Sequence, residues 1–180
     1  MGITQSTSNN KTKAKAKEII KQIEELTERR VSDILFDSDI DNWNIFTSVF
    51  SQIIINKEHI IIIIEDTEGN KFGGYVNEKI DKVDSWISDL HLFVFSLESK
   101  GRIEGMKKFD IKRPQHSFKL HNKSHNCLFS FGLGDIVVYK ENNKTKSYCY
   151  QFSFEYKGNE NALCGKEHFT PKRIIVIQMK

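Results

Sequence analysis

The stretch that decides the fold reads Ile62-Ile63-Ile64-Glu65-Asp66-Thr67-Glu68-Gly69-Asn70-Lys71-Phe72-Gly73-Gly74-Tyr75. It ends an uninterrupted aliphatic run, and such β-branched runs are typical of buried strands. The tip at Glu68-Gly69-Asn70 supplies a residue with positive φ, which closes a hairpin. The Gly73-Gly74 pair lets another backbone or a large ring approach the return strand closely. The stretch therefore predicts a hairpin in the centre of a sheet.

Further short, β-rich segments separated by polar turns lie on both sides of this hairpin. A short helix fits residues 43–52, where four apolar residues fall at helical spacing. Many short strands with few helices indicate an antiparallel sandwich. We therefore expect a mainly β domain over residues 32–180, a two-sheet antiparallel β-sandwich. Its other strands are predicted at 33–37, 90–97, 101–107, 118–120, 127–131, 135–140, 147–154 and 173–178.

The chain before this domain divides into two parts. Residues 1–12 are almost without apolar side chains, which favours a disordered tail. Residues 13–31 favour an amphipathic helix, with Ile19, Ile20, Ile23 and Leu26 on one stripe. This stripe could pack on the domain itself or in the groove of a partner, and the pattern does not choose between them.

The N-terminus carries two signals for membrane attachment. Met1-Gly2-Ile3-Thr4-Gln5-Ser6 fits the pattern for myristoylation of Gly2 after removal of Met1. One myristoyl chain binds a membrane only marginally, so a second signal is needed. A lysine cluster close behind it supplies attraction to anionic lipids. The two signals together predict a cytoplasmic protein peripheral to a membrane, with the basic cluster formed by Lys11, Lys13, Lys15 and Lys17.

Composition narrows the function classes. The 180 residues include 27 basic and 24 acidic side chains, a net charge of +3. That bias is well below the dense basic surface of a dedicated nucleic-acid binder. The longest aliphatic run covers residues 60–64, far short of the roughly 20 apolar residues that a spanning helix needs. The three cysteines are widely spaced and odd in number, which favours reduced thiols.

The candidate metal-binding motifs are incomplete or lie in polar stretches, and common catalytic motifs are absent from the sequence. Asp37, Asp39 and Asp41 have the spacing that opens a calcium loop, but the loop lacks its glycine and its closing glutamate. A second stretch contains residue types that zinc prefers, among several lysine, asparagine and serine residues typical of an exposed loop. We assign it no metal; its members are His116, His121, His125 and Cys127. Since nucleophile-elbow, nucleotide-loop and HExxH motifs are absent from the sequence, we expect a non-catalytic protein without cofactors.

Several motifs in order resemble the TLDc domain family of oxidation-resistance-type proteins. The family has a strand, an Asp-x-x-Gly turn and a Phe-Gly-Gly/Ala-aromatic strand, as at Asp66, Gly69, Phe72, Gly73 and Gly74. Residues 35–41 are similar to its first motif, and residues 92–97 to a Phe-Leu-Phe-Ser-Leu strand. A Gly-rich turn and a closing Glu-x-Phe segment follow. The later matching residues are Phe93, Phe95, Gly132, Gly134, Glu167 and Phe169. The sequence departs from the family at the final strand, where Ile175 and Ile177 replace an acidic residue and a tryptophan.

This resemblance implies the functions that are associated with the family. The protein would be a protein-binding module that protects against oxidative stress and contacts subunits of the vacuolar proton-pumping ATPase. The alternative from the residues alone is a nucleic-acid-binding stress regulator. Its surface would be the segment 107–123, which places Lys107, Lys108, Lys112, Arg113, Lys119 and Lys123 beside Phe109, Phe118 and His116.

Overall fold

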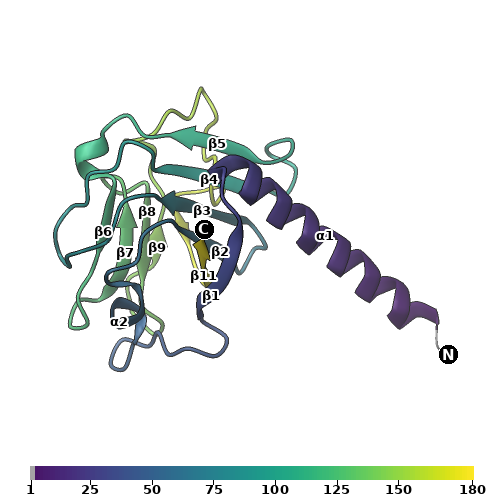
Figure 1. Cartoon of the computed structure of the whole chain (residues 1–180), viewed down its shortest axis with the longest axis horizontal. Coiled ribbons are helices and arrows are strands. Elements are labelled where there is room, and N and C mark those ends of the chain that lie inside the picture. The colour runs from purple at the N-terminus through teal and green to yellow at the C-terminus, as the bar shows by residue number, and fades with distance from the viewer. Residues whose placement is uncertain (1–2) are drawn as a thin grey trace.

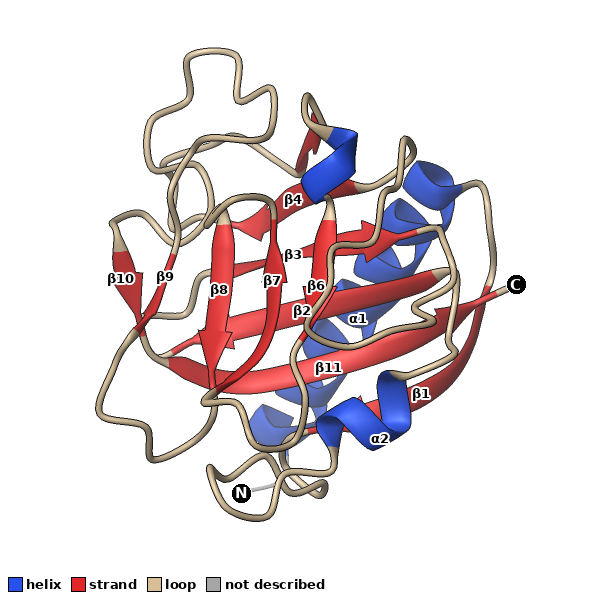
Figure 2. Ribbon diagram, turned by 90° about the vertical axis from the view of Figure 1, so that its left-hand side faces the viewer, coloured by secondary structure: helices blue, strands red, loops and turns tan. Residues whose placement is uncertain are grey.

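Two antiparallel sheets and one long helix make up the computed structural model, which describes the backbone of residues 3–180 and the side chains of residues 13–180. The sheets face each other, and helix α1 (Ile3–Thr27) lies on the outer side of the larger one (Figure 2). The predicted fold class, a two-sheet antiparallel β-sandwich preceded by an amphipathic helix, is confirmed.

The larger sheet has six strands built around the predicted hairpin. They are β1 (Val31–Asp37), β2 (Ile60–Asp66), β3 (Lys71–Val76), β4 (Phe93–Glu98), β5 (Lys107–Asp110) and β11 (Pro171–Met179). Their order is β1-β11-β2-β3-β4-β5, and every neighbouring pair is antiparallel. The hairpin register sets Ile62 opposite Gly74 and Ile63 opposite Gly73. In this order β11, the last strand along the chain, lies between β1 and β2.

The smaller sheet has five strands. They are β6 (Phe118–Leu120), β7 (Cys127–Phe131), β8 (Ile136–Tyr139), β9 (Ser147–Tyr148) and β10 (His168–Phe169). Their order is β10-β9-β8-β7-β6. In Figure 2 the strands β6 to β8 cross those of the larger sheet steeply, as in orthogonal sheet packing. A single helical turn, η1 (Pro114–His116), precedes β6, and the short helix α2 (Phe50–Ile54) lies beside β1.

Aromatic side chains fill the space between the two sheets. Phe50 stacks on Phe129 with ring centroids 5.3 Å apart, and Phe118 meets Phe131 edge-on at 5.0 Å. From the larger sheet, alternate residues of β2 point into this core, with Ile62 completely buried. Each such buried ring or aliphatic side chain contributes about 1.5–3 kcal/mol of hydrophobic stabilisation. This core holds the two sheets together.

A second, smaller apolar cluster lies on the other face of the larger sheet. Ile23 of α1 is buried there among Ile61, Tyr75, Phe93 and other sheet residues. Ile19 and Leu26 pack against the same cluster from the turns on either side. The apolar stripe of the helix therefore packs on its own domain, which settles the alternative that the sequence leaves open.

The helix is longer than the sequence analysis predicts. It begins at Ile3 and ends at Thr27, whereas the expected order was a disordered tail to residue 12 and a helix over 13–31. Its 25 residues contain neither glycine nor proline, so nothing in them interrupts a helix once packing has fixed its second half. Residues 1 and 2, including Gly2, lie outside the described residues.

Three local predictions are wrong. Residues 43–49 form turns instead of a helix, because the side chain of Asn42 accepts the backbone N–H of Asn44 at 3.0 Å and that of Asn44 accepts Phe46 at 3.0 Å. Residues 101–106 are a loop, since Lys100 and Gly101 both adopt positive φ. The strand predicted over 147–154 ends at Tyr148.

Candidate interaction surface

The tip of the β2–β3 hairpin is fixed by a buried carboxylate. Asp66 accepts the backbone N–H groups of Glu68 at 2.9 Å and Asn70 at 2.8 Å through one oxygen. Its other oxygen accepts the side-chain amide of Asn70 at 2.8 Å. Gly69 has φ of +83°, as the turn requires. The motif residues Asp66 and Gly69 therefore shape the turn, and their role is structural.

A residue that the sequence analysis missed ties this turn to a distant loop. Arg102 donates to the side chain of Asn70 at 2.9 Å, to the carbonyl of Asn161 at 2.6 Å and to that of Leu163 at 3.2 Å. Its partners are 32 to 61 positions away in the chain, so no local pattern could have indicated them. Arg102 joins the hairpin tip to the segment that precedes β10.

The glycine pair in β3 permits two different close approaches, as the sequence predicts. A Cβ on Gly73 would overlap the backbone of Ile62. A Cβ on Gly74 would overlap the ring of Phe131 from the smaller sheet. Phe72 packs edge-on against Phe169 at 5.0 Å. The motif residues therefore all lie in the core: Phe72, Gly73, Gly74 and Phe169.

The Gly-rich turn between β7 and β8 holds a second buried carboxylate. Gly132 and Gly134 both have positive φ there, at +59° and +107°. Asp135 accepts the N–H groups of Phe152 at 2.9 Å and Ser153 at 3.0 Å, and the hydroxyl of Tyr156 at 2.9 Å. Burial raises the pKa of this carboxyl above its ordinary value. These bonds hold residues 152 and 153 at the Gly-rich turn. The chain that follows β9 therefore leaves the sheet, and the strand ends early.

An apolar groove runs along one side of α1. It has a volume of about 450 Å³ and is open to solvent between the helix and the outer face of the larger sheet. Ile34 on the edge strand β1 is 63% exposed beside it, and Ile20 of the helix is 40% exposed. Charged side chains also line it. The apolar lining is Ile19, Ile20, Ile34, Ile63, Leu97, Ile175 and Ile177.

The two departures from the family pattern in β11 fall in this groove. Ile175 and Ile177 form part of its floor. The acidic residue of the family pattern would make this floor polar, and the tryptophan would fill part of the groove. The motif residues Phe93 and Phe95 are buried under α1 on the same face. By contrast, Glu167 is exposed and lies away from the groove, just before β10.

The lysines of the predicted basic cluster do not share one face. Figure 1 shows α1 extending past the edge of the sandwich, with its N-terminal end free of the sheets. Lys13 and Lys17 are exposed and one helical turn apart, so both lie on one side. The ammonium of Lys15 is instead 3.1 Å from Glu98 of β4. The side chain of Lys11 lies outside the described residues.

In the basic segment 107–123, the two phenyl rings predicted to stack on bases are not accessible. Phe109 and Phe118 are both buried in the core. Two of its lysines are already over rings of this chain: Lys108 is 4.6 Å from the centre of Phe93, and Lys119 is 4.4 Å from that of Trp86. The alternative, nucleic-acid-binding surface is therefore left with charges and without the two phenyl rings on which bases would stack.

All three cysteines are free and buried, in keeping with reduced thiols. Burial raises the pKa of the Cys149 thiol well above its ordinary value. The thiol of Cys164 donates to the carbonyl of Lys166 at 2.8 Å. Over the described residues, none of the helices combines the length and the apolar content that crossing a bilayer requires.

Comparison with known protein families gives one match that spans nearly the whole chain. The family model described as the TLDc domain matches residues 4–178. The match begins inside α1, about thirty residues before the first motif that the sequence analysis recognised at Leu35. A search of curated proteins finds none that is significantly similar to the chain.

Proposed function

Because the chain belongs to the TLDc domain family, we propose that it is a non-catalytic interaction module, cytoplasmic and peripheral to a membrane, that binds a protein partner. The family's associations favour subunits of the vacuolar proton-pumping ATPase as the partner and a role in the oxidative-stress response. Neither catalysis nor a cofactor is part of this proposal.

The observation that carries the proposal is the apolar groove beside α1. Exposed isoleucines gather there from the helix and from β1, while the floor is Ile63, Ile175 and Ile177. Apolar surfaces rimmed by charged side chains are typical of protein-binding sites. Lys15, Lys71 and Arg173 in its lining are already paired with acidic side chains of this chain, so the groove favours the apolar face of an amphipathic segment of the partner.

Membrane attachment is the second half of the proposal. Lys13 and Lys17 lie on one side of a helix whose N-terminal end is free of the sandwich. Each lysine near an anionic surface contributes about 1 kcal/mol, so this pair contributes about 2 kcal/mol, or roughly thirtyfold in binding. Myristoylation of Gly2 would add a marginal affinity of about 10⁴ M⁻¹. We expect attachment to need both contributions.

The intact mass of the protein from its own cells, combined with vesicle flotation, tests this attachment. We expect loss of Met1, gain of a C14 acyl group, and flotation on anionic vesicles that Gly2→Ala abolishes. The double variant Lys13→Glu/Lys17→Glu should reduce flotation, because both exposed charges reverse. Lys79→Glu/Lys82→Glu makes the same charge change in an exposed loop after β3 and serves as the matched control. An unmodified N-terminus and a protein that never floats would contradict the attachment.

Co-purification with vacuolar ATPase subunits tests the partner. Ile34→Asp places a charge in the groove and should abolish co-purification. Ile40→Asp is the control, since Ile40 is 84% exposed and lies outside the groove. Equal recovery of the subunits with both variants would contradict the groove as the binding surface.

The nucleic-acid alternative has its own test. Lys112, Arg113 and Lys123 remain exposed in the segment 107–123. A mobility shift of DNA or RNA that weakens steeply with salt would favour it. Binding that is absent at low salt would dismiss it.

A further inference from the structure

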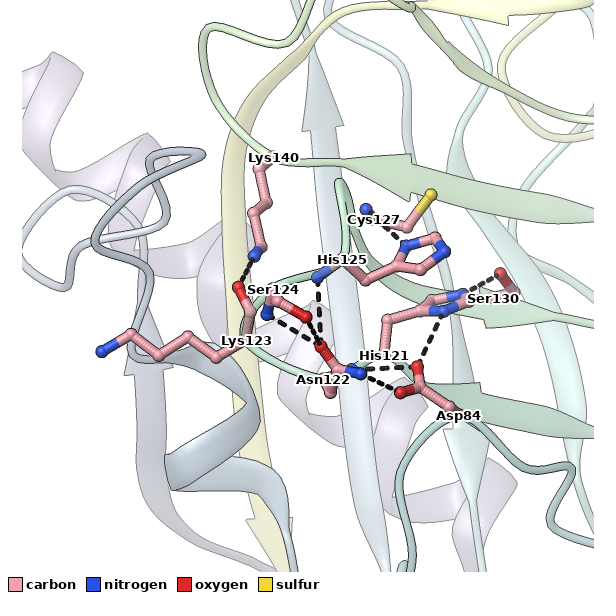
Figure 3. A network of polar contacts seen from close by, with 9 residues as sticks. All are labelled: Asp84, His121, Asn122, Lys123, Ser124, His125, Cys127, Ser130 and Lys140. Atoms are coloured by element: carbon pink, nitrogen blue, oxygen red, sulfur yellow. Dashed lines mark hydrogen bonds and ion pairs between the residues drawn. The ribbon is translucent and has the colours of Figure 1, made fainter.

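The hairpin between β6 and β7 gathers two histidines and a cysteine at the edge of the smaller sheet. His121 follows β6 directly, His125 lies in the connecting turn, and Cys127 is the first residue of β7. One nitrogen of each histidine and the sulfur of Cys127 all lie within 4.8 Å of one another (Figure 3). The two imidazole rings stack with centroids 4.3 Å apart. Three side chains of the two types that zinc prefers, histidine and cysteine, therefore meet in one place.

The turn that brings them together is held by its own hydrogen bonds. The side-chain oxygen of Asn122 accepts the backbone N–H of Ser124 at 2.8 Å and that of His125 at 3.1 Å. Lys140 of the neighbouring strand end donates to the carbonyl of Lys123 at 2.5 Å. The turn thus sets the position of His125, whose ring lies beside that of His121 in Figure 3.

His121 is oriented as metal-binding histidines are. Its Nδ1 lies 3.6 Å from a carboxylate oxygen of Asp84, and its Nε2 lies 3.0 Å from the hydroxyl of Ser130. A carboxylate beside Nδ1 favours the proton on that nitrogen, so the lone pair lies on Nε2, where the metal would replace the Ser130 hydroxyl. Zinc binds the neutral form of the imidazole ring.

We propose that His121, His125 and Cys127 bind one Zn²⁺ ion, with a solvent molecule at the fourth position. The donor set of two nitrogens and one sulfur matches a borderline-soft cation and excludes the hard cations Ca²⁺ and Mg²⁺, which take oxygen ligands. Asp84 acts as the positioning residue of His121.

Binding requires a small contraction of the cluster. Zinc bonds of about 2.0 Å to nitrogen and 2.3 Å to sulfur place the two nitrogens about 3.3 Å apart and each nitrogen about 3.5 Å from the sulfur. His125 supplies the movement, because it is exposed and lies on a turn. Its Nδ1 now accepts the backbone N–H of Cys127 at 3.0 Å, and this bond is given up as the ring turns toward the metal. Because zinc binds the thiolate, the forming Zn–S bond releases the Cys127 thiol proton to solvent.

Titration of the full chain with Co²⁺ and then Zn²⁺ tests the site. After treatment with a chelator, we expect the protein to take up one Co²⁺ per chain with a sulfur-to-cobalt charge-transfer absorption, and Zn²⁺ to displace it. Cys127→Ser should lose that absorption. His125→Gln should bind Zn²⁺ at least about 100-fold more weakly, and Asp84→Asn about tenfold more weakly, the usual cost of losing an outer-shell partner.

The matched control is His168→Gln, which removes an exposed histidine from β10, outside the cluster. His125→Gln is expected to fold, because His125 is exposed, and circular dichroism checks this. Wild-type protein without the charge-transfer absorption would overturn the proposal. So would Zn²⁺ affinity in folded His125→Gln within about tenfold of wild type.

Discussion

The two faces of the six-stranded sheet are covered in different ways. The inner face meets a second sheet, and Phe72 of the larger sheet packs edge-on against Phe169 of the smaller one there. The outer face meets one helix, whose stripe of Ile19, Ile23 and Leu26 covers only part of the apolar surface. The remainder is the groove. The inner face therefore contributes most of the apolar core, while the outer face leaves part of its apolar surface open to solvent.

Ile62 and Ile63 give the sharpest test, because they are neighbours in β2 and point to opposite faces. Ile62→Ala should cost about 3 kcal/mol in the free energy of unfolding, since it leaves a cavity in a fully buried site. Ile63→Ala removes the same atoms from the half-buried floor of the groove and should cost about 1 kcal/mol. Urea denaturation measures both. Equal losses would mean that the two faces contribute alike.

The attachment of α1 can be weakened alone. Ile23→Ala should cost about 2 kcal/mol, because Ile23 is the buried anchor of the helix. Hydrogen exchange should then speed up in the helix and remain slow in β2 and β3. Ile20→Ala, in the exposed part of the same helix, is the control. If strand amides lost protection together with the helix, the outer layer would belong to the same cooperative unit as the core.

The smallest effect is expected at the edge that both faces share. Arg173 of β11 donates to both carboxylate oxygens of Asp37 in β1, at 3.0 and 2.6 Å. These bonds hold the pKa of Asp37 below its ordinary value. The stabilisation is therefore present above about pH 4 and is lost as the pH falls through the lowered pKa of the folded state.

We expect Arg173→Gln to cost about 1 kcal/mol at pH 7 and to flatten the acid limb of the stability curve. Thermal unfolding from pH 2 to pH 7 measures this. Lys172→Gln removes a neighbouring, fully exposed partner of Glu65 and should leave the curve unchanged. An unchanged acid limb in Arg173→Gln would show that the pair does not stabilise the edge.

Sequence reasoning was strongest where one local pattern carried all the information. The sequence predicted the β2–β3 hairpin, its turn at Gly69 and the close approaches at Gly73 and Gly74. Each of these depends on residues that are adjacent in the chain. The prediction of strand ends failed where a residue distant in the sequence determines the local backbone conformation. The early end of β9 depends on Asp135, and nothing in residues 149–154 reveals that bond.

The candidate sites show the same limit. The apolar stripe of α1 was visible, but the groove also needs Ile34 and Ile175, which only strand pairing brings to the helix. The histidines and Cys127 were recognised as a cluster in sequence. Their meeting depends on the register of β6 and β7 and on Asp84, which is 37 positions from His121.

The place of β11 has a consequence for how the protein is made. This strand is last in chain order, yet it pairs with β1 on one side and β2 on the other, with Val31 opposite Met179. During synthesis, β1 and β2 leave the ribosome long before the strand that joins them. Until then both present unpaired edges, which are prone to wrong pairing. The larger sheet can close only after translation has passed residue 179, so a chaperone that shields β1 and β2 from premature pairing would raise the yield of folded protein.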